Sequence, residues 1–185
     1  MKHSILTYTF GLAALCAYAA FGQTGQHANL SQGDRTFVND MARGNMSEIE
    51  LGKLAQQKAS NSEVKQLADR IVNDHTNLND QLKQWAQSSN VTLPNQISST
   101  ESSHKQHLES LSGNDFDKAY IQIMLSDHQH DIHAVQQEAE HGQDQQVKQL
   151  AQKALPLLED HVRLAENAAG QLGISASKGL NKPNR

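Results

Sequence analysis

Cysteine, proline and aromatic residues are all scarce in this chain of 185 residues. The single cysteine, Cys16, lies close to the N-terminus, so the rest of the chain cannot form an internal disulfide bond. Only three prolines interrupt the sequence, aromatic residues make up 4%, and Gln, Ala and Leu are abundant. This composition favours helix over strand, and it predicts an all-α protein that is stabilised by packing alone.

Several motifs of catalysis and nucleic-acid binding are also missing. The chain has no Gly-x-Ser-x-Gly elbow, no His-Glu-x-x-His run and no phosphate-binding loop. Its formal net charge is −4, and no basic stripe with interleaved aromatic residues occurs, which argues against a nucleic-acid partner. We therefore assign no catalytic residue from the sequence and favour a protein that is not an enzyme.

The N-terminus has the pattern of an export signal. A short basic start is followed by an apolar run over residues 5–21 and by small residues around Ala20-Phe21-Gly22; Ala17-Tyr18-Ala19 is a second cleavage candidate. The apolar run is shorter than the roughly 20 residues of a comfortable membrane span. Leu15 is too large a neighbour for lipoprotein processing at Cys16, which leaves that route as the less favoured alternative. These features predict an exported protein, either periplasmic or associated with the outer membrane, where an envelope protein or the membrane surface would be its partner.

The pattern of apolar and breaking residues divides the chain into four parts. We expect a signal peptide over residues 1–22, a polar linker over 23–33, a helical domain over 34–172 and a disordered basic tail over 173–185. Within the domain, periodicity predicts long helices over about 34–59, 60–88, 114–141 and 144–172, and a short one over 101–111. Ser60 with Glu63 has the spacing of a capping box at the start of the second helix.

One phrase occurs twice, as VKQLADRIVNDH over residues 64–75 and as VKQLAQKALPLLEDH over residues 147–161. Both copies place apolar residues at alternating steps of three and four, which is typical of an amphipathic helix. The second copy is three residues longer before its histidine, and a bulge at Pro156 would absorb the difference. Two related helical hairpins joined by a long connection predict a ferritin-like antiparallel four-helix bundle with a short crossover helix.

Seven short segments in a fixed order carry a resemblance to a known family. They are Glu48-Ile-Glu-Leu-Gly-Lys-Leu-Ala, Val64-Lys-Gln-Leu-Ala with Asp74-His75, Leu93-Pro94, Leu111-Ser-Gly-Asn-Asp-Phe-Asp-Lys-Ala-Tyr120, Asp127-His128-Gln129, Ala154-Leu-Pro156 and His161. Over about Thr36–Leu172 the chain resembles the exported bacterial domain of unknown function number four-one-four-two, which is often labelled a predicted outer membrane protein. The resemblance implies a ferritin-like fold and export, and it implies no particular activity.

Each predicted long helix contributes one polar residue to its apolar stripe. These four residues are the candidate metal ligands, with the neighbouring aspartates as groups that would orient the imidazoles: Glu48, His75, His128 and His161 as ligands, and Asp74, Asp127 and Asp160 behind them. Imidazoles and a carboxylate in a dry core suit iron, zinc or copper. A ferritin-type di-iron centre needs more carboxylates, and Val72 and Leu158 stand where its Glu-x-x-His glutamates would be. The alternative is that each histidine is neutral and has only a structural role.

Three functions follow from this pattern. The first is an exported bundle of the cell envelope with a metal-binding or stress-protective role. The second is a metal-dependent oxidoreductase whose site lies in the bundle core. The third is a scaffold that binds a partner protein.

Overall fold

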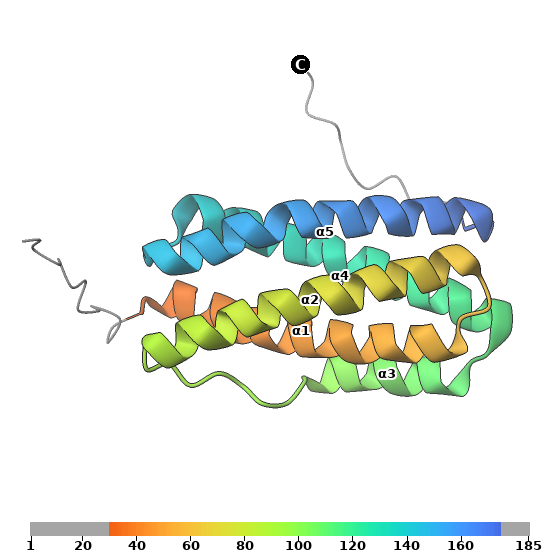
Figure 1. The fold of residues 1–185 in the computed structure, drawn as a ribbon, viewed down its shortest axis with the longest axis horizontal. Coiled ribbons are helices and arrows are strands. Elements are labelled where there is room, and N and C mark those ends of the chain that lie inside the picture. The colour runs from red at the N-terminus through yellow and green to blue at the C-terminus, as the bar shows by residue number, and fades with distance from the viewer. Residues whose placement is uncertain (1–29, 175–185) are drawn as a thin grey trace, which may run out of the picture.

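The computed structural model describes residues 30–174, and within them all regular structure is helical (Figure 1). The predicted signal peptide and most of the predicted linker and tail lie outside the described residues. The helices are α1 (Gln32–Lys58), α2 (Ser62–Ser88), α3 (Ser99–Ser110), α4 (Gly113–His141) and α5 (Gln145–Gln171). Each lies within two or three residues of its predicted bounds, and α1 begins inside the segment predicted as linker. No helix in the described range is long and apolar enough to cross a membrane.

The four long helices form two antiparallel hairpins that pack against each other. Helices α1 and α2 form the first hairpin, α4 and α5 form the second, and α2 packs on α5. The short helix α3 lies outside the bundle against α1 and α4, after the long connection from α2 (Figure 1). The predicted four-helix bundle with a short crossover helix is therefore confirmed.

Polar residues at the helix ends explain where the helices begin. The side chain of Ser31 accepts a hydrogen bond from the Asp34 amide at the start of α1, and Ser98 with Glu101 forms a capping box at the start of α3. The Asn61 side chain caps α2 by accepting from the amides of residues 63 and 64. The predicted capping role of Ser60 is therefore wrong, because the Ser60 hydroxyl donates to Asp117 on α4 instead.

The two hairpins have the same layout along the sequence. Helices α2 and α5 are equally long, so the step from Ser62 to Gln145 at their starts equals the step from Ser88 to Gln171 at their ends. The same step leads from the last residue of α1 to the last residue of α4. This constant step, the hairpin offset, assigns to each residue of the first hairpin its counterpart in the second.

The two hairpins also exchange contacts at their turns. Asp34 on α1 accepts hydrogen bonds from the amides of residues 143 and 144 at 2.9 and 3.0 Å. Asp117, at the offset position on α4, accepts from the amides of Ser60 and Asn61 at 3.0 and 2.9 Å. Each hairpin therefore supplies the carboxylate that satisfies the turn of the other hairpin.

The hairpin offset pairs Val64 with Val147, as the repeated phrase predicts, but it does not pair the two histidines. His75 on α2 corresponds to Leu158 on α5, and His161 corresponds to Leu78. The two Asp-His pairs are therefore not equivalent positions. Helix α5 continues through Pro156 without a break, so the predicted bulge is not needed. The histidines instead lie at different heights in two helices of equal length.

Apolar residues fill the bundle on either side of a central polar layer. Around the α1–α2 turn the core contains Leu51, Ile71, Phe116 and Tyr120. Towards the other end it contains Val38, Leu82, Trp85 and Val147, together with a smaller group around Leu78, Val135 and Leu158. The three predicted histidines lie between these clusters and are all buried.

Candidate metal centre

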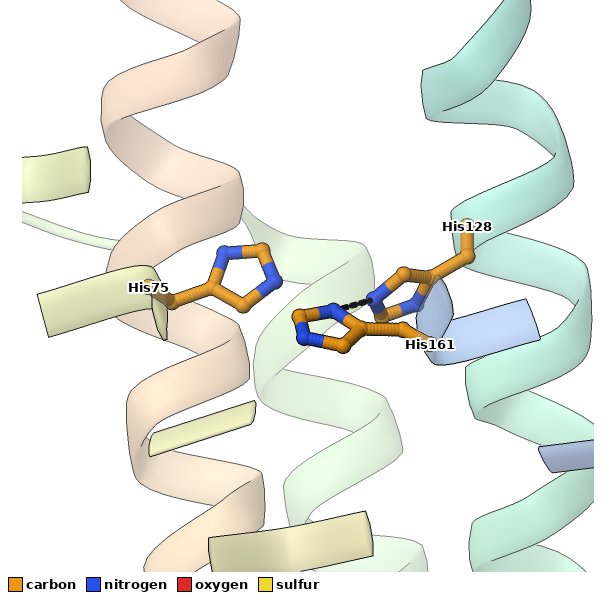
Figure 2. Close-up of side chains that lie close together, drawn as sticks. All are labelled: His75, His128 and His161. Atoms are coloured by element: carbon orange, nitrogen blue, oxygen red, sulfur yellow. Dashed lines mark hydrogen bonds between the residues drawn. The ribbon is translucent and has the colours of Figure 1, made fainter. Parts of the chain in front are cut away.

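Three imidazoles from three helices converge in the polar layer (Figure 2). His75 projects from α2, His128 from α4 and His161 from α5, and each is at most 3% exposed. One nitrogen atom from each ring lies within 4.8 Å of the other two. In the described part of the chain this is the only group of three or more His, Cys, Asp or Glu side chains within such reach.

The remaining nitrogen of each ring is held by an oxygen atom. Nδ1 of His128 lies 3.0 Å from the Met124 carbonyl oxygen, one turn earlier in α4. Nε2 of His161 lies 3.0 Å from Asp74 Oδ2 on α2, and Nδ1 of His75 lies 2.9 Å from Asn45 Oδ1 on α1. Because these oxygens only accept, each of the three contacts requires a proton on the ring nitrogen. The other nitrogen of a neutral ring then carries a free lone pair.

A count of protons shows that two neutral rings cannot satisfy this arrangement. His128 Nε2 also lies 3.0 Å from His161 Nδ1, so these two rings, the Met124 carbonyl and Asp74 form a chain of three contacts. Three hydrogen bonds need three protons, whereas two neutral imidazoles carry two. If both outer contacts are made, two lone pairs face each other in the middle. A metal ion between them removes this conflict, because it accepts both lone pairs.

Burial disfavours the other solution, which is an extra proton on one ring. Desolvation, together with the charge that His161 would carry, lowers the pKa of His128 to about 3. Desolvation also lowers the pKa of His161, although Asp74 acts in the opposite direction. Asp74 is itself paired with Arg70, whose Nε lies 2.7 Å from the same Oδ2 atom. The arrangement therefore favours neutral rings with lone pairs directed inward.

His75 completes a set of three nitrogen donors. Its Nδ1 is used by Asn45, and its Nε2 is buried without a hydrogen-bond partner. Figure 2 shows the His75 ring pointing towards the other two imidazoles from the opposite side of the layer. Nitrogen atoms about 2.0–2.1 Å from a zinc ion lie about 3.3–3.5 Å from one another. The three ring nitrogens, which lie within 4.8 Å of one another, would therefore need only a small side-chain movement to coordinate one zinc ion together.

The fourth predicted ligand, Glu48, lies behind this group. Its Oε1 is 3.6 Å from Nδ1 of His128, the nitrogen that faces away from the other two rings. Burial raises the pKa of Glu48 well above its usual range, and the carboxylates of Asp127, Asp131 and Glu101 raise it further. Glu48 is therefore a neutral acid in this state, and its Oε2 has no hydrogen-bond partner. The structure does not bring it into the group of converging nitrogens.

The three predicted orienting aspartates have different surroundings. Asp74 holds His161 on the neighbouring helix, rather than the adjacent His75. Asp127 faces His104 on α3 at 3.5 Å, and Asp160 bonds Arg163 on its own helix. Only Asp74 therefore contacts one of the three converging imidazoles.

Asn45 is the residue at this site that the sequence did not indicate. It corresponds to His128 under the hairpin offset, so related positions in the two hairpins both contribute to the polar layer. Its spacing from the buried residues Val38 and Ala42 places it on the inward face of α1. The signal was a polar residue at a core spacing, which is unusual without a partner.

Fold and site together define an all-helical bundle of two related hairpins that encloses three inward-facing imidazoles. The family profile of DUF4142, a domain of unknown function, matches residues 19–168, and the chain belongs to this family. No curated protein sequence matches the chain.

Two solved structures share the fold. One is a DUF305 protein of Streptomyces coelicolor, described as a candidate secreted protein, with 21% sequence identity and a TM-score of 0.65. The match covers 76% of this chain and 94% of that one. The other is a DUF305 fragment of Deinococcus radiodurans, with 15% identity, a TM-score of 0.69 and coverage of 77% and 98%. At these identities the likeness establishes the fold alone.

Proposed function

We propose that the protein is an exported bundle that binds one transition-metal ion through His75, His128 and His161. The observation that supports this most directly is the facing pair of nitrogens in a chain that has one proton too few. A metal ion satisfies both nitrogens and the unpartnered Nε2 of His75 at once. Storage or sequestration of a metal in the envelope would agree with the predicted stress-protective role.

The donor set indicates which metals fit. Three neutral imidazoles and no thiolate suit zinc or copper, and three histidines leave one coordination position open. A dinuclear iron centre fits poorly, because the two carboxylates at the site, Asp74 and Glu48, both contact ring nitrogens that face away from the converging ones. Burial of a cation in this dry layer would favour ionisation of Glu48, which we assign the role of charge compensation rather than ligation.

Metal analysis and thermal unfolding of the untagged protein test the proposal. We expect one equivalent of zinc or copper per chain, and a free metal concentration a thousand times Kd should stabilise the native state by about 4 kcal/mol. His128→Gln should abolish both effects. His133→Gln is the matched control, because His133 is an exposed residue of the same helix. Wild-type protein that neither retains metal nor is stabilised by zinc, copper or iron would rule the proposal out.

The proposed location rests on separate observations. The N-terminal pattern of the sequence predicts a signal peptide, and a structural neighbour is described as a candidate secreted protein. We propose export to the periplasm or the outer membrane, where an envelope protein or the membrane surface is the expected partner. Cell fractionation and N-terminal sequencing of the exported protein would test this, and an intact N-terminus in the cytoplasm would contradict it.

One observation favours a metal-dependent oxidoreductase as the second candidate. A cleft between α1 and α4 reaches His75, so a small molecule could approach the open coordination position. Cobalt-substituted protein would show a changed visible spectrum on addition of azide if this position is accessible. Oxygen-dependent turnover by the metal-loaded protein would then distinguish an enzyme from a storage protein.

A further inference from the structure

The cleft between α1 and α4 has a volume of about 720 Å³ and an apolar middle. Its walls include Phe37 and Met41 on α1 and Val135 on α4, with Leu158 on α5 opposite. This volume lies within the range of about 300–1,000 Å³ that is typical of small-molecule sites. The cleft is therefore large enough for an organic ligand and apolar enough to hold an alkyl chain.

The relation between the two hairpins explains why this space exists. Under the hairpin offset, Gly33 corresponds to Phe116 and Phe37 to Tyr120. In the second hairpin Phe116 and Tyr120 are fully buried, and Leu108 from α3 packs in the same cluster. In the first hairpin Gly33 supplies no side chain. Helix α3 packs against the opposite end of the bundle, so the equivalent region at the start of α1 is open.

The acidic and basic side chains that line the cleft are unevenly balanced. Among the described residues no lysine or arginine lines it, whereas four carboxylates do. Asp40 is paired with Arg43, and Asp34 caps the α4–α5 turn, so both have partners already. Asp131 and Glu138 are left as the two carboxylates of the cleft without a cationic partner at hydrogen-bonding distance, although the Glu138 side chain is hydrogen-bonded to that of Asp34. An anionic ligand would be repelled here, and a cationic one attracted.

These two carboxylates stand at opposite ends of the apolar middle. Asp131 lies beside Gly44 on α1, since a Cβ at Gly44 would be 3.8 Å from its Oδ2. Glu138 lies one helical heptad further along α4, about 10 Å away at 1.5 Å per residue. The Glu138 end also holds a buried acceptor atom without a partner, Glu138 Oε1. Glu138 lines the cleft and is less than one-tenth exposed.

We propose that this cleft binds a linear organic dication, an alkyl diamine whose ammonium groups pair with Asp131 and Glu138 across the apolar middle. The spacing selects the length of the ligand, because a chain of seven or eight carbons holds its two nitrogens about 10–11 Å apart. The ammonium at Glu138 satisfies the unpartnered Oε1 atom. The inference does not depend on a metal ion at the three histidines.

Calorimetric titration of the chelator-treated protein tests the proposal. The probes are 1,8-diaminooctane, the shorter 1,4-diaminobutane, the monocation octylamine and the dianion octanedioate. We expect one equivalent of 1,8-diaminooctane to bind at least tenfold more tightly than any of the others. Equal affinity for octylamine, or tighter binding of octanedioate, would overturn the assignment, as would absence of binding.

Four variants separate the named contacts from general attraction. Asp131→Asn and Glu138→Gln should each weaken 1,8-diaminooctane at least tenfold, whereas Glu159→Gln, at an exposed position on α5, should not. Ala134→Trp adds bulk at an exposed position of the cleft wall and should block binding while all charges are retained. Unchanged affinity in Asp131→Asn and Glu138→Gln would refute the proposal. Repetition with zinc-treated protein should give the same affinity, since the diamine is expected to bind in both states, so failure of the metal proposal would leave this result unchanged.

Discussion

Substitution of Asp74 is the most direct test of how the imidazoles are held, because this residue contacts one of the rings and is not part of the apolar core. Its Oδ2 accepts from Nε2 of His161 at 3.0 Å and is 2.7 Å from Arg70 Nε. In Asp74→Asn, an amide nitrogen placed at this position would donate to Nε2 and move the ring proton to Nδ1. The lone pair that faces His128 would then be lost.

The expected size of this effect follows from comparable sites. Removal of a group that orients a metal-binding histidine weakens metal affinity by about 10–100-fold. This corresponds to about 1.4–2.7 kcal/mol of binding free energy. The metal-free variant should unfold within about 1 kcal/mol of the parent protein, because Asp74 is partly exposed and solvent can replace its contact with Arg70.

Competition with a chelator of known zinc affinity measures the change. Asp160→Asn is the matched control, because Asp160 lies next to His161 in sequence but bonds Arg163. We expect its zinc affinity to stay within twofold of the parent protein. If Asp74→Asn and the parent bind zinc equally well, the assignment of protons in the histidine chain is wrong.

Three further predictions concern stability. Asp117→Ala leaves the two turn amides without an acceptor and should cost about 3–5 kcal/mol in denaturant unfolding, whereas the exposed Asp115→Ala should cost less than about 1 kcal/mol. Gly52→Ala places a Cβ 2.7 Å from Val72 Cγ2 and should cost about 1–3 kcal/mol, most of which Val72→Ala in the same chain should restore. Burial and nearby carboxylates raise the pKa of Glu138 to about 7, so its ionisation opposes folding as the pH rises from about 4.5 through 7. Glu138→Gln should therefore increase the free energy of unfolding by about 1–3 kcal/mol at pH 8, which raises the melting temperature, and should leave it unchanged at pH 4. An equal gain at both pH values would contradict this cause.

Helix positions could be predicted because the signals are local. Gly142 is a helix stop and Asp144 a helix cap, both act over three or four residues, and the structure uses both. The capping role of Ser60 could not be excluded from the sequence, because the residue that binds it is Asp117, 57 positions away. Local chemistry thus fixed the elements, and contacts between hairpins decided among the candidate caps.

The convergence of His128 and His161 illustrates a limit of counting along helices. Counted from the turn at Gly142, His128 lies 14 residues before it and His161 19 after it, which on straight helices of about 1.5 Å per residue separates the two by about 7 Å. The bulge expected at Pro156 would have reduced this gap. Side chains in a helix lean towards its N-terminus, so in an antiparallel pair one ring leans away from the turn and the other towards it. The rings meet with centroids 5.1 Å apart, and α5 stays regular.

Contacts between helices decided the parts of the site that the sequence left open. Burial of Glu48 was expected, but only the packing of α1 against α4 places it behind His128 instead of beside the other nitrogens. Asn45 was missed because its role depends on which residue of α2 lies opposite it. The packing of one helix against another decides the positions of both Glu48 and Asn45, and the residue pattern of a single helix carries no information about that packing.

The exchange of aspartates between the two turns bears on how such a chain could arise. One hairpin alone would leave two amides at its own turn unsatisfied and would carry an aspartate with nothing to bind. Two identical hairpins packed about a twofold axis would satisfy both turns with a single aspartate per copy. A symmetric dimer of a half-length chain would thus satisfy its own turns. Duplication and fusion of its gene would leave both turn contacts in place. The residues at the centre could then diverge, into histidine in one hairpin and asparagine or leucine at the corresponding position of the other.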